Sequence, residues 1–108
     1  MKEKILLGGY TKRVSKGVYS VLLDTKAAEL SSLNEVAAVQ NPTYITLDEK
    51  GHLYTCAADS NGGGIAAFDF DGETATHLGN VTTTGAPLCY VAVDEARQLV
   101  YGANYHLG

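Results

Sequence analysis

The chain has 108 residues, a formal net charge of −4, and 45% hydrophobic and 19% charged residues. This length suits one domain with a modest core, and the acidic balance gives no indication of a nucleic-acid or anionic-membrane partner. Twelve glycines, seven tyrosines and only two prolines favour short strands and tight turns over helices. The composition therefore predicts an all-β protein.

The N-terminal residues predict neither a signal peptide nor a membrane span. Its apolar run, Ile5-Leu6-Leu7, follows three charged residues and is far too short for a signal-peptide core or a membrane span. We therefore expect a cytoplasmic protein without a membrane partner.

Two cysteines, Cys56 and Cys89, both fall in apolar strand patterns. We interpret them as two small buried residues, with a disulfide as the alternative. Neither has a second cysteine at metal-ligand spacing. The sequence thus predicts no metal site and no cofactor.

A repeat organises the whole chain. Leu6, Leu53 and Val100 are equivalent points at a constant spacing of 47 residues. Strand-built repeats of this period are the signature of a β-propeller, and a propeller needs about four to eight blades of four antiparallel strands to close. The sequence therefore predicts about two blades, the N-terminal third of a larger ring.

In chain order, residues 1–40 form a partial blade with strands over 4–10, 17–23 and 30–39. A helix over 25–33 is the alternative, but that segment has no apolar stripe. Residues 41–86 form a complete blade, with strands over 42–48, 52–58, 64–70 and 74–81. Residues 87–108 begin the next blade, with strands over 87–94 and 98–104.

The match between the second and third copies supports this division. The segment from Pro42 to Glu49 aligns with that from Pro87 to Glu95 after one inserted residue. An ordinary antiparallel β domain with chance similarity is the alternative, and the constant spacing argues against it. Gly62-Gly63-Gly64 has no helix or Gly-Lys-Ser/Thr after it, so we interpret it as a flexible hairpin and not a phosphate loop.

Strand polarity sorts the connections onto two ends. Seven of the twelve acidic residues lie in the turns of one end, namely Asp24, Asp48, Glu49, Asp71, Glu73, Asp94 and Glu95. The other end carries Lys12, Arg13, Lys16, Asn41, Asp59, Asn61, Asn104, Tyr105 and His106. Its basic cluster suits a phosphorylated or carboxylated small molecule, and a solvated hairpin loop is the alternative.

His106 is the candidate for acid–base chemistry, because it ends a strand at the mouth of the ring. It suits a general acid/base or a hydrogen-bond donor, and the alternative is an exposed loop residue without a role. We interpret His52 and His77 as structural. Tyr10 either lines the rim or packs, and packing is the favoured interpretation. The residues assemble no Ser-His-Asp set.

Several motifs together resemble one family. In order along the chain these are Gly8-Gly9-Tyr10-Thr11, Lys16-Gly17-Val18-Tyr19, Asn41-Pro42-Thr43-Tyr44, Leu53-Tyr54, Gly85-Ala86-Pro87 and Ala103-Asn104-Tyr105-His106-Leu107-Gly108. Over essentially the whole chain, they resemble the start of the lactonase-type seven-bladed propellers. That family includes 6-phosphogluconolactonase and fungal enzymes that cyclise carboxymuconate.

The resemblance implies a cytoplasmic protein with a metal-independent site at the ring mouth and a phosphorylated sugar lactone as substrate. Seven blades at this period need about 330 residues, and the family's acid/base His and its Arg and Glu partners lie in later blades. Asn104, Tyr105 and Tyr10 carry over as rim residues, whereas Ala58-Asp59 stands where many members have Asn-Glu.

We therefore expect the intact protein to hydrolyse 6-phosphoglucono-lactone to 6-phosphogluconate, with Lys12, Arg13 and His106 supplying charge or protons. The chain alone lacks a complete catalytic set. The alternatives are a non-catalytic propeller that acts as a binding or scaffold module, and a lactonising cycloisomerase of the carboxymuconate type.

Overall fold

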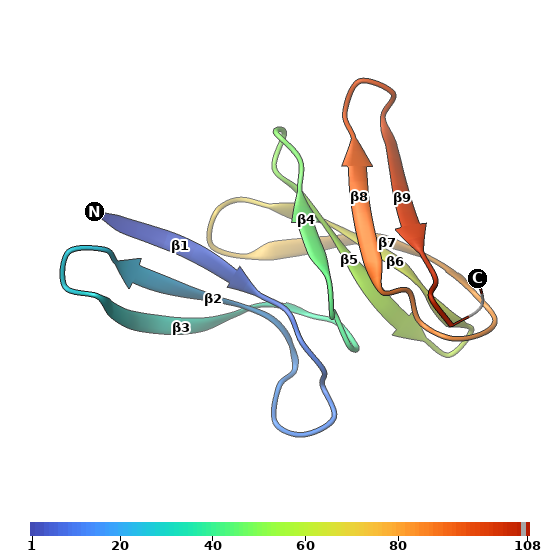
Figure 1. Cartoon of the computed structure of the whole chain (residues 1–108), viewed down its shortest axis with the longest axis horizontal. Coiled ribbons are helices and arrows are strands. Elements are labelled where there is room, and N and C mark those ends of the chain that lie inside the picture. Colours follow the sequence, from blue (N-terminus) through green and yellow to red (C-terminus); the bar gives the residue numbers. More distant parts are fainter. Residues whose placement is uncertain (107) are drawn as a thin grey trace.

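The computed structural model describes residues 1–106 and 108, and all of the regular structure in them is antiparallel β-sheet (Figure 1). Nine strands form three sheets of three, four and two strands. The strands are β1 (Lys2–Leu7), β2 (Gly17–Asp24), β3 (Glu29–Ala38), β4 (Ile45–Leu47), β5 (His52–Asp59), β6 (Gly62–Phe70), β7 (Ala75–Thr83), β8 (Tyr90–Asp94) and β9 (Leu99–Ala103).

The predicted all-β class and all nine strands are confirmed, with shifts of a few residues at their ends. Strands follow one another as neighbours in every sheet, in the orders β1-β2-β3, β4-β5-β6-β7 and β8-β9. The segment that offered a helical alternative, 25–33, forms a turn and the start of β3. In the described part of the chain, no helix is long or apolar enough to cross a membrane.

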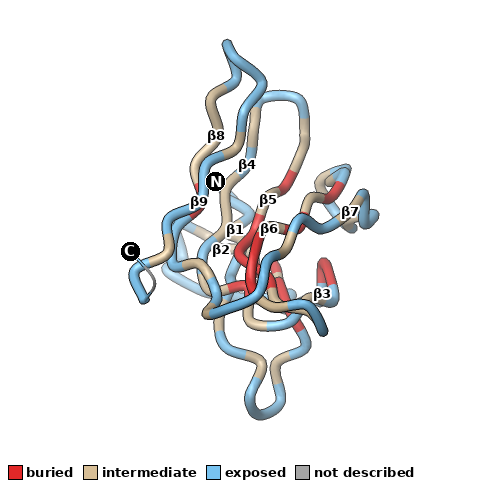
Figure 2. Tube along the Cα trace, turned by 90° about the vertical axis from the view of Figure 1, so that its right-hand side faces the viewer, coloured by how far each residue is buried: buried red, intermediate tan, exposed pale blue. Residues whose placement is uncertain are grey.

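The core lies between the first and the middle sheet. Figure 2 shows the buried residues along β5 and β6 and on the strands beside them. Val18 and Leu53 are completely buried, and burial of such side chains stabilises the fold by about 1.5–3 kcal/mol each. The full cluster contains Val18, Val36, Ala37, Leu53, Ala57, Ala66 and Phe68.

Two further contacts join the sheets. The rings of Tyr44 and Tyr90 lie 4.5 Å apart between the middle and third sheets, a separation at which aromatic pairs attract. Lys4 on β1 donates to the carbonyl of Gly72 and pairs with the Glu73 carboxylate at 2.9 Å. The sheets therefore pack as neighbours face to face, as the blades of a propeller do.

The glycine run 62–64 is not a flexible hairpin, contrary to the prediction. These residues are the first three of β6, and the turn before them contains only Ser60 and Asn61. A Cβ on Gly64 would lie 1.9 Å from the Val81 carbonyl oxygen, and one on Gly62 2.0 Å from that of Thr83. The close approach of the β7 backbone requires residues without side chains.

The interpretation of both cysteines as buried is half wrong. Both thiols are free, and Cys56 is completely buried, whereas Cys89 is exposed. Cys89 precedes β8, and its backbone N–H donates to the Ala103 carbonyl at 2.9 Å. The strand predicted over 87–94 begins only at Tyr90, so Cys89 lies in the connection before the strand.

The aspartates of the acidic end close the turns of that end. Asp71 accepts the backbone N–H groups of Glu73 and Thr74, both at 2.8 Å, and Asp24, Asp48 and Asp94 bond their own turns in the same manner. Side-chain capping of this kind is the usual reason for aspartate in turns. The four aspartates of the acidic end therefore have a structural role.

Candidate functional site

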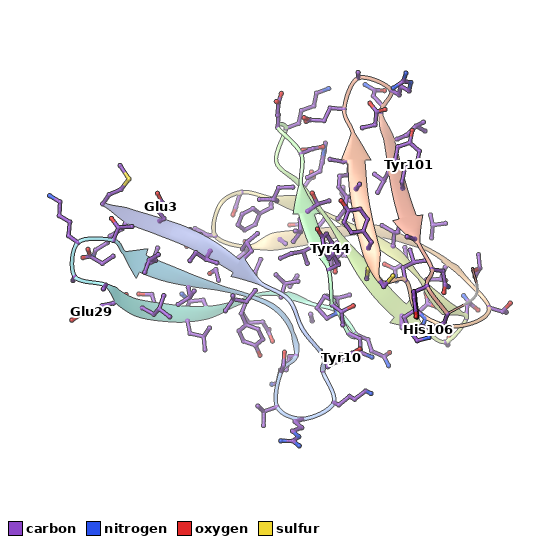
Figure 3. All side chains as sticks on the ribbon, in the orientation of Figure 1. Glu3, Tyr10, Glu29, Tyr44, Tyr101 and His106 are labelled. Atoms are coloured by element: carbon purple, nitrogen blue, oxygen red, sulfur yellow. The ribbon has the colours of Figure 1, made fainter. Side chains whose placement is uncertain are left out.

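The end opposite these turns carries a pocket of about 510 Å³ between the first and third sheets. Figure 3 labels Tyr10 and His106 on this lower side of the molecule, and both line the pocket. The other lining residues are Lys12, Asn41, Thr43, Pro87, Leu88 and Cys89. Residues as far apart in the sequence as Tyr10 and His106 thus meet here, because successive sheets place their loops side by side.

The pocket lining is basic. None of the described residues that line it carries a carboxylate, whereas Lys12 supplies an ammonium group and His106 an imidazole. The Lys12 Nζ lies 4.9 Å from the centroid of the Tyr10 ring, within the range of a cation–π interaction. The arrangement is therefore suited to an anionic ligand.

The wall that carries Tyr10 and Lys12 is fixed by a pair of residues that the sequence did not single out together. Asn41 Oδ1 accepts the backbone N–H of Thr11 at 2.9 Å and its hydroxyl at 3.1 Å, and the Asn41 N–H donates to the same hydroxyl at 3.1 Å. Asn41 has a φ of 51°, which asparagine tolerates better than most residues. An asparagine in the connection after β3, directly before Pro42, is the one sequence signal for this contact.

The opposite wall is held in a comparable way. The Asn104 side chain donates to the Ala86 carbonyl at 2.9 Å and ties the end of β9 to the connection between β7 and β8. The ring of His106 meets that of Tyr105 edge to face, with centroids 5.8 Å apart. Asn104 therefore supports the wall, and His106 is the residue that reaches the pocket.

The predicted site residues thus separate into two groups. Tyr10, Lys12 and His106 line one pocket, and Tyr10 is 65% exposed among the described residues. The described pocket lining does not include Arg13, Asn104 or Tyr105. Arg13 and Tyr105 are exposed, and Asn104 is half-buried. Leu107, part of the last motif, lies outside the described residues.

The acidic end has a smaller pocket of about 160 Å³ beside His52. His52 Nδ1 lies 2.7 Å from Asp48 Oδ2, and its Nε2 lies 3.5 Å from Asp69 Oδ1. Both ring nitrogens thus face carboxylates of the fold. This agrees with the structural role predicted for His52. His77 bonds Asn80 at 2.7 Å and packs against Phe68.

Among the residues described, no three His, Cys, Asp or Glu side chains come close enough together to hold a metal ion. At the basic pocket the chain offers one ammonium and one imidazole group. These groups can bind an anion and donate a hydrogen bond to a neutral oxygen.

Comparison with known proteins places the chain among propeller proteins. The family described as "Lactonase, 7-bladed beta-propeller" matches residues 4–108. A 6-phosphogluconolactonase of Bacillus subtilis (strain 168) is 37% identical over 105 residues, covering 94% of this chain and 30% of that protein. An uncharacterized protein of Lactococcus lactis subsp. cremoris (strain MG1363) is 91% identical over all 108 residues, which are 32% of its length.

A crystal structure of a protein from Lactobacillus plantarum superimposes with a TM-score of 0.93 at 53% identity. The match covers 98% of this chain and 31% of that one. The chain thus spans about a third of the length of the relatives that it matches. Because the family match extends over nearly the whole chain, the chain belongs to the lactonase family of seven-bladed β-propellers.

Proposed function

We propose that the chain is the N-terminal part of a cytoplasmic seven-bladed propeller that hydrolyses a sugar lactone, 6-phosphoglucono-lactone, to 6-phosphogluconate. In this proposal residues 1–40, 41–86 and 87–108 belong to three successive blades, and the remaining blades close the ring. Family membership supports the reaction class, and the Bacillus subtilis relative supports the substrate.

The observation that carries the proposal is the basic pocket itself. Lys12 and His106 face one hollow whose described lining has no carboxylate, at the end where the loops of successive sheets meet. A sugar phosphate needs a cation for its phosphate group and hydrogen bonds for its ring oxygens. The pocket offers both.

In the proposed reaction, water attacks the lactone carbonyl carbon and gives up a proton to a general base. The ester C–O bond of the ring then breaks, and the released oxygen takes up a proton, so the product is a hydroxy acid. Lys12 holds the phosphate, and His106 donates a hydrogen bond to the substrate. The general base and the donors for the oxyanion come from the remaining blades.

The test is lactone hydrolysis by the intact protein, measured with phosphorylated and unphosphorylated gluconolactone. We expect Lys12→Ala to raise KM for the phosphorylated lactone about tenfold, the loss of one charge-assisted hydrogen bond. Arg13→Ala is the matched control, because Arg13 is the adjacent cation and is not among the described lining residues.

An intact protein that hydrolyses neither lactone would overturn the proposal. Binding of sugar phosphate without turnover would identify a non-catalytic binding module. Turnover of a carboxylated lactone alone would identify a cycloisomerase of the carboxymuconate type.

A further inference from the structure

The pocket wall that carries Lys12 belongs to the long connection between β1 and β2. This connection protrudes from the sheets (Figure 1), and Lys12, Arg13 and Val14 are exposed on it. An ammonium group on such a loop has a defined place over the pocket only if the start of the loop is anchored.

The Thr11–Asn41 pair supplies that anchor. Its three hydrogen bonds, of 2.9, 3.1 and 3.1 Å, join the loop to the connection between β3 and β4. The Thr11 hydroxyl donates a hydrogen bond to the Asn41 side chain and accepts one from the Asn41 backbone N–H, so it acts as donor and acceptor at once. Both residues are half-buried, which limits competition from water for these hydrogen bonds.

Two backbone features show that the two segments are built to lie against each other. A Cβ on Gly8 would lie 2.2 Å from the Pro42 carbonyl oxygen, so the contact requires glycine at position 8. Asn41 keeps a left-handed φ of 51°, a conformation that persists where surrounding contacts hold it. Its hydrogen bonds to Thr11 are such contacts.

The anchored residue lies between the two residues that form the wall. Tyr10 and Lys12 flank Thr11 in the sequence, and the Lys12 Nζ lies 4.9 Å from the Tyr10 ring centroid. Asn41, the second residue of the anchor, and Thr43 line the same pocket from the connection between β3 and β4. A shift of Thr11 therefore moves the ammonium relative to the rest of the pocket.

We propose that Thr11 and Asn41 are positioning residues, which fix Lys12 where it pairs with the phosphate group of the substrate. This proposal rests on the lactonase function proposed above. An ammonium group that is displaced from the phosphate loses its charge-assisted hydrogen bond and weakens binding of the phosphorylated substrate. The pair acts on the phosphate end of the substrate and leaves the chemistry at the lactone unchanged.

The experiment uses the intact protein with Thr11→Val and Asn41→Gly. Thr11→Val keeps the shape and removes the hydroxyl, whereas Asn41→Gly keeps the left-handed backbone and removes the side chain. Thr11→Ser is the rescue variant. Thr25→Val is the matched control, because the Thr25 hydroxyl donates to the Met1 carbonyl at 3.0 Å at the far end of the same sheet.

We expect both test variants to raise KM for 6-phosphogluconolactone about tenfold, the effect expected for loss of one charge-assisted contact. KM for unphosphorylated gluconolactone and both kcat values stay within about twofold, because that substrate does not use Lys12. Thr11→Ser and Thr25→Val behave like the parent protein. Amide hydrogen exchange accelerates in residues 8–16 and not in β5.

An equal rise in KM for the two lactones would overturn the positioning role, since a merely structural defect affects both. Unchanged exchange in residues 8–16 would overturn the anchor. A parent protein without activity on either lactone would overturn the lactonase proposal and the positioning role with it. In that case, faster exchange in the variants would still show that the pair holds the loop.

Discussion

His52 makes two hydrogen bonds to the Asp48 carboxylate, one from its ring and one from its backbone. Its Nδ1 lies 2.7 Å from Asp48 Oδ2, and its backbone N–H donates to Asp48 Oδ1 at 2.8 Å. The same Oδ1 accepts the Lys50 N–H at 2.9 Å. One carboxylate thus closes the turn between β4 and β5 and orients the first side chain of β5.

This arrangement predicts an acid-sensitive turn. Burial by itself would raise the pKa of Asp48, but the hydrogen bonds from His52 and Lys50 hold that pKa below its ordinary value of 3.8. A group whose pKa is lower in the folded state stabilises the fold fully above its unfolded pKa, and this contribution is lost as pH falls through the folded pKa. Asp48→Asn should therefore lower the melting temperature at neutral pH and reduce its fall below pH 3.8.

Thermal unfolding of the intact protein at about pH 7 and about pH 3 checks this prediction. Asp69→Asn is the control, because the Asp69 carboxylate is 63% exposed and lies 3.5 Å from the other nitrogen of the His52 ring. We expect Asp69→Asn to change the melting temperature less than Asp48→Asn does, since exposed ion pairs contribute little to stability. Equal pH dependence in the two variants would contradict the assignment to Asp48.

The glycines of the sheet should differ sharply in their tolerance of a methyl group. Gly64→Ala places a Cβ 1.9 Å from the Val81 carbonyl oxygen, whereas a Cβ on Gly79 meets nothing within 4 Å. We expect Gly64→Ala to destabilise the fold by about 1–3 kcal/mol, as overpacking does. Gly79→Ala should stabilise it by up to about 1 kcal/mol. Denaturant unfolding of the two variants provides the comparison, and equal stability would show that β7 moves away from β6 without cost.

The two cysteines should react at very different rates. Cys56 is completely buried, and burial raises the pKa of its thiol, so the reactive thiolate is scarce and inaccessible. Cys89 is exposed and lines the basic pocket. In the folded protein, we expect iodoacetamide to alkylate Cys89 and not Cys56. After unfolding, we expect it to alkylate both thiols. Mass spectrometry of the labelled peptides identifies the site, and Cys89→Ser should abolish native labelling.

His106 should contribute a hydrogen bond to the substrate and not the acid–base chemistry. His106→Ala in the intact protein is expected to lower kcat/KM for the lactone by about tenfold, the value of one hydrogen bond, with an unchanged pH–rate profile. His77→Ala, which alters an exposed histidine outside the described pocket lining, is the control. A loss of about 10²–10⁴-fold with a shifted profile would instead identify His106 as the general acid/base.

The strands were predictable because their signals are local. Turn residues such as Asp71-Gly72 and the repeated Asp-Glu after Leu47 and Val93 mark the strand ends, and repetition allowed one copy to be checked against another. The sequence also indicated which end carries Lys12 and His106, since strand direction alone decides this.

Contacts between distant segments were not predictable. The Thr11–Asn41 hydrogen bonds join residues 30 positions apart. The repeat pattern of the sequence does not predict which loop residues pair across such a distance. The tight packing at Gly64 depends on how closely β7 approaches. The exposure of Cys89 follows from a strand that begins at Tyr90, three residues later than predicted. Each of these features depends on packing in three dimensions, where the neighbours of a side chain come from other strands.

The aspartate-closed turns have a consequence for how such a protein can change. Asp24, Asp48, Asp71 and Asp94 each bond groups within four residues of themselves, so strand register is set locally at the end remote from the pocket. Loops at the pocket end can then be exchanged, lengthened or recharged without disturbing that register. Redesign of ligand preference should accordingly proceed one connection at a time, from the residues around Lys12 and His106.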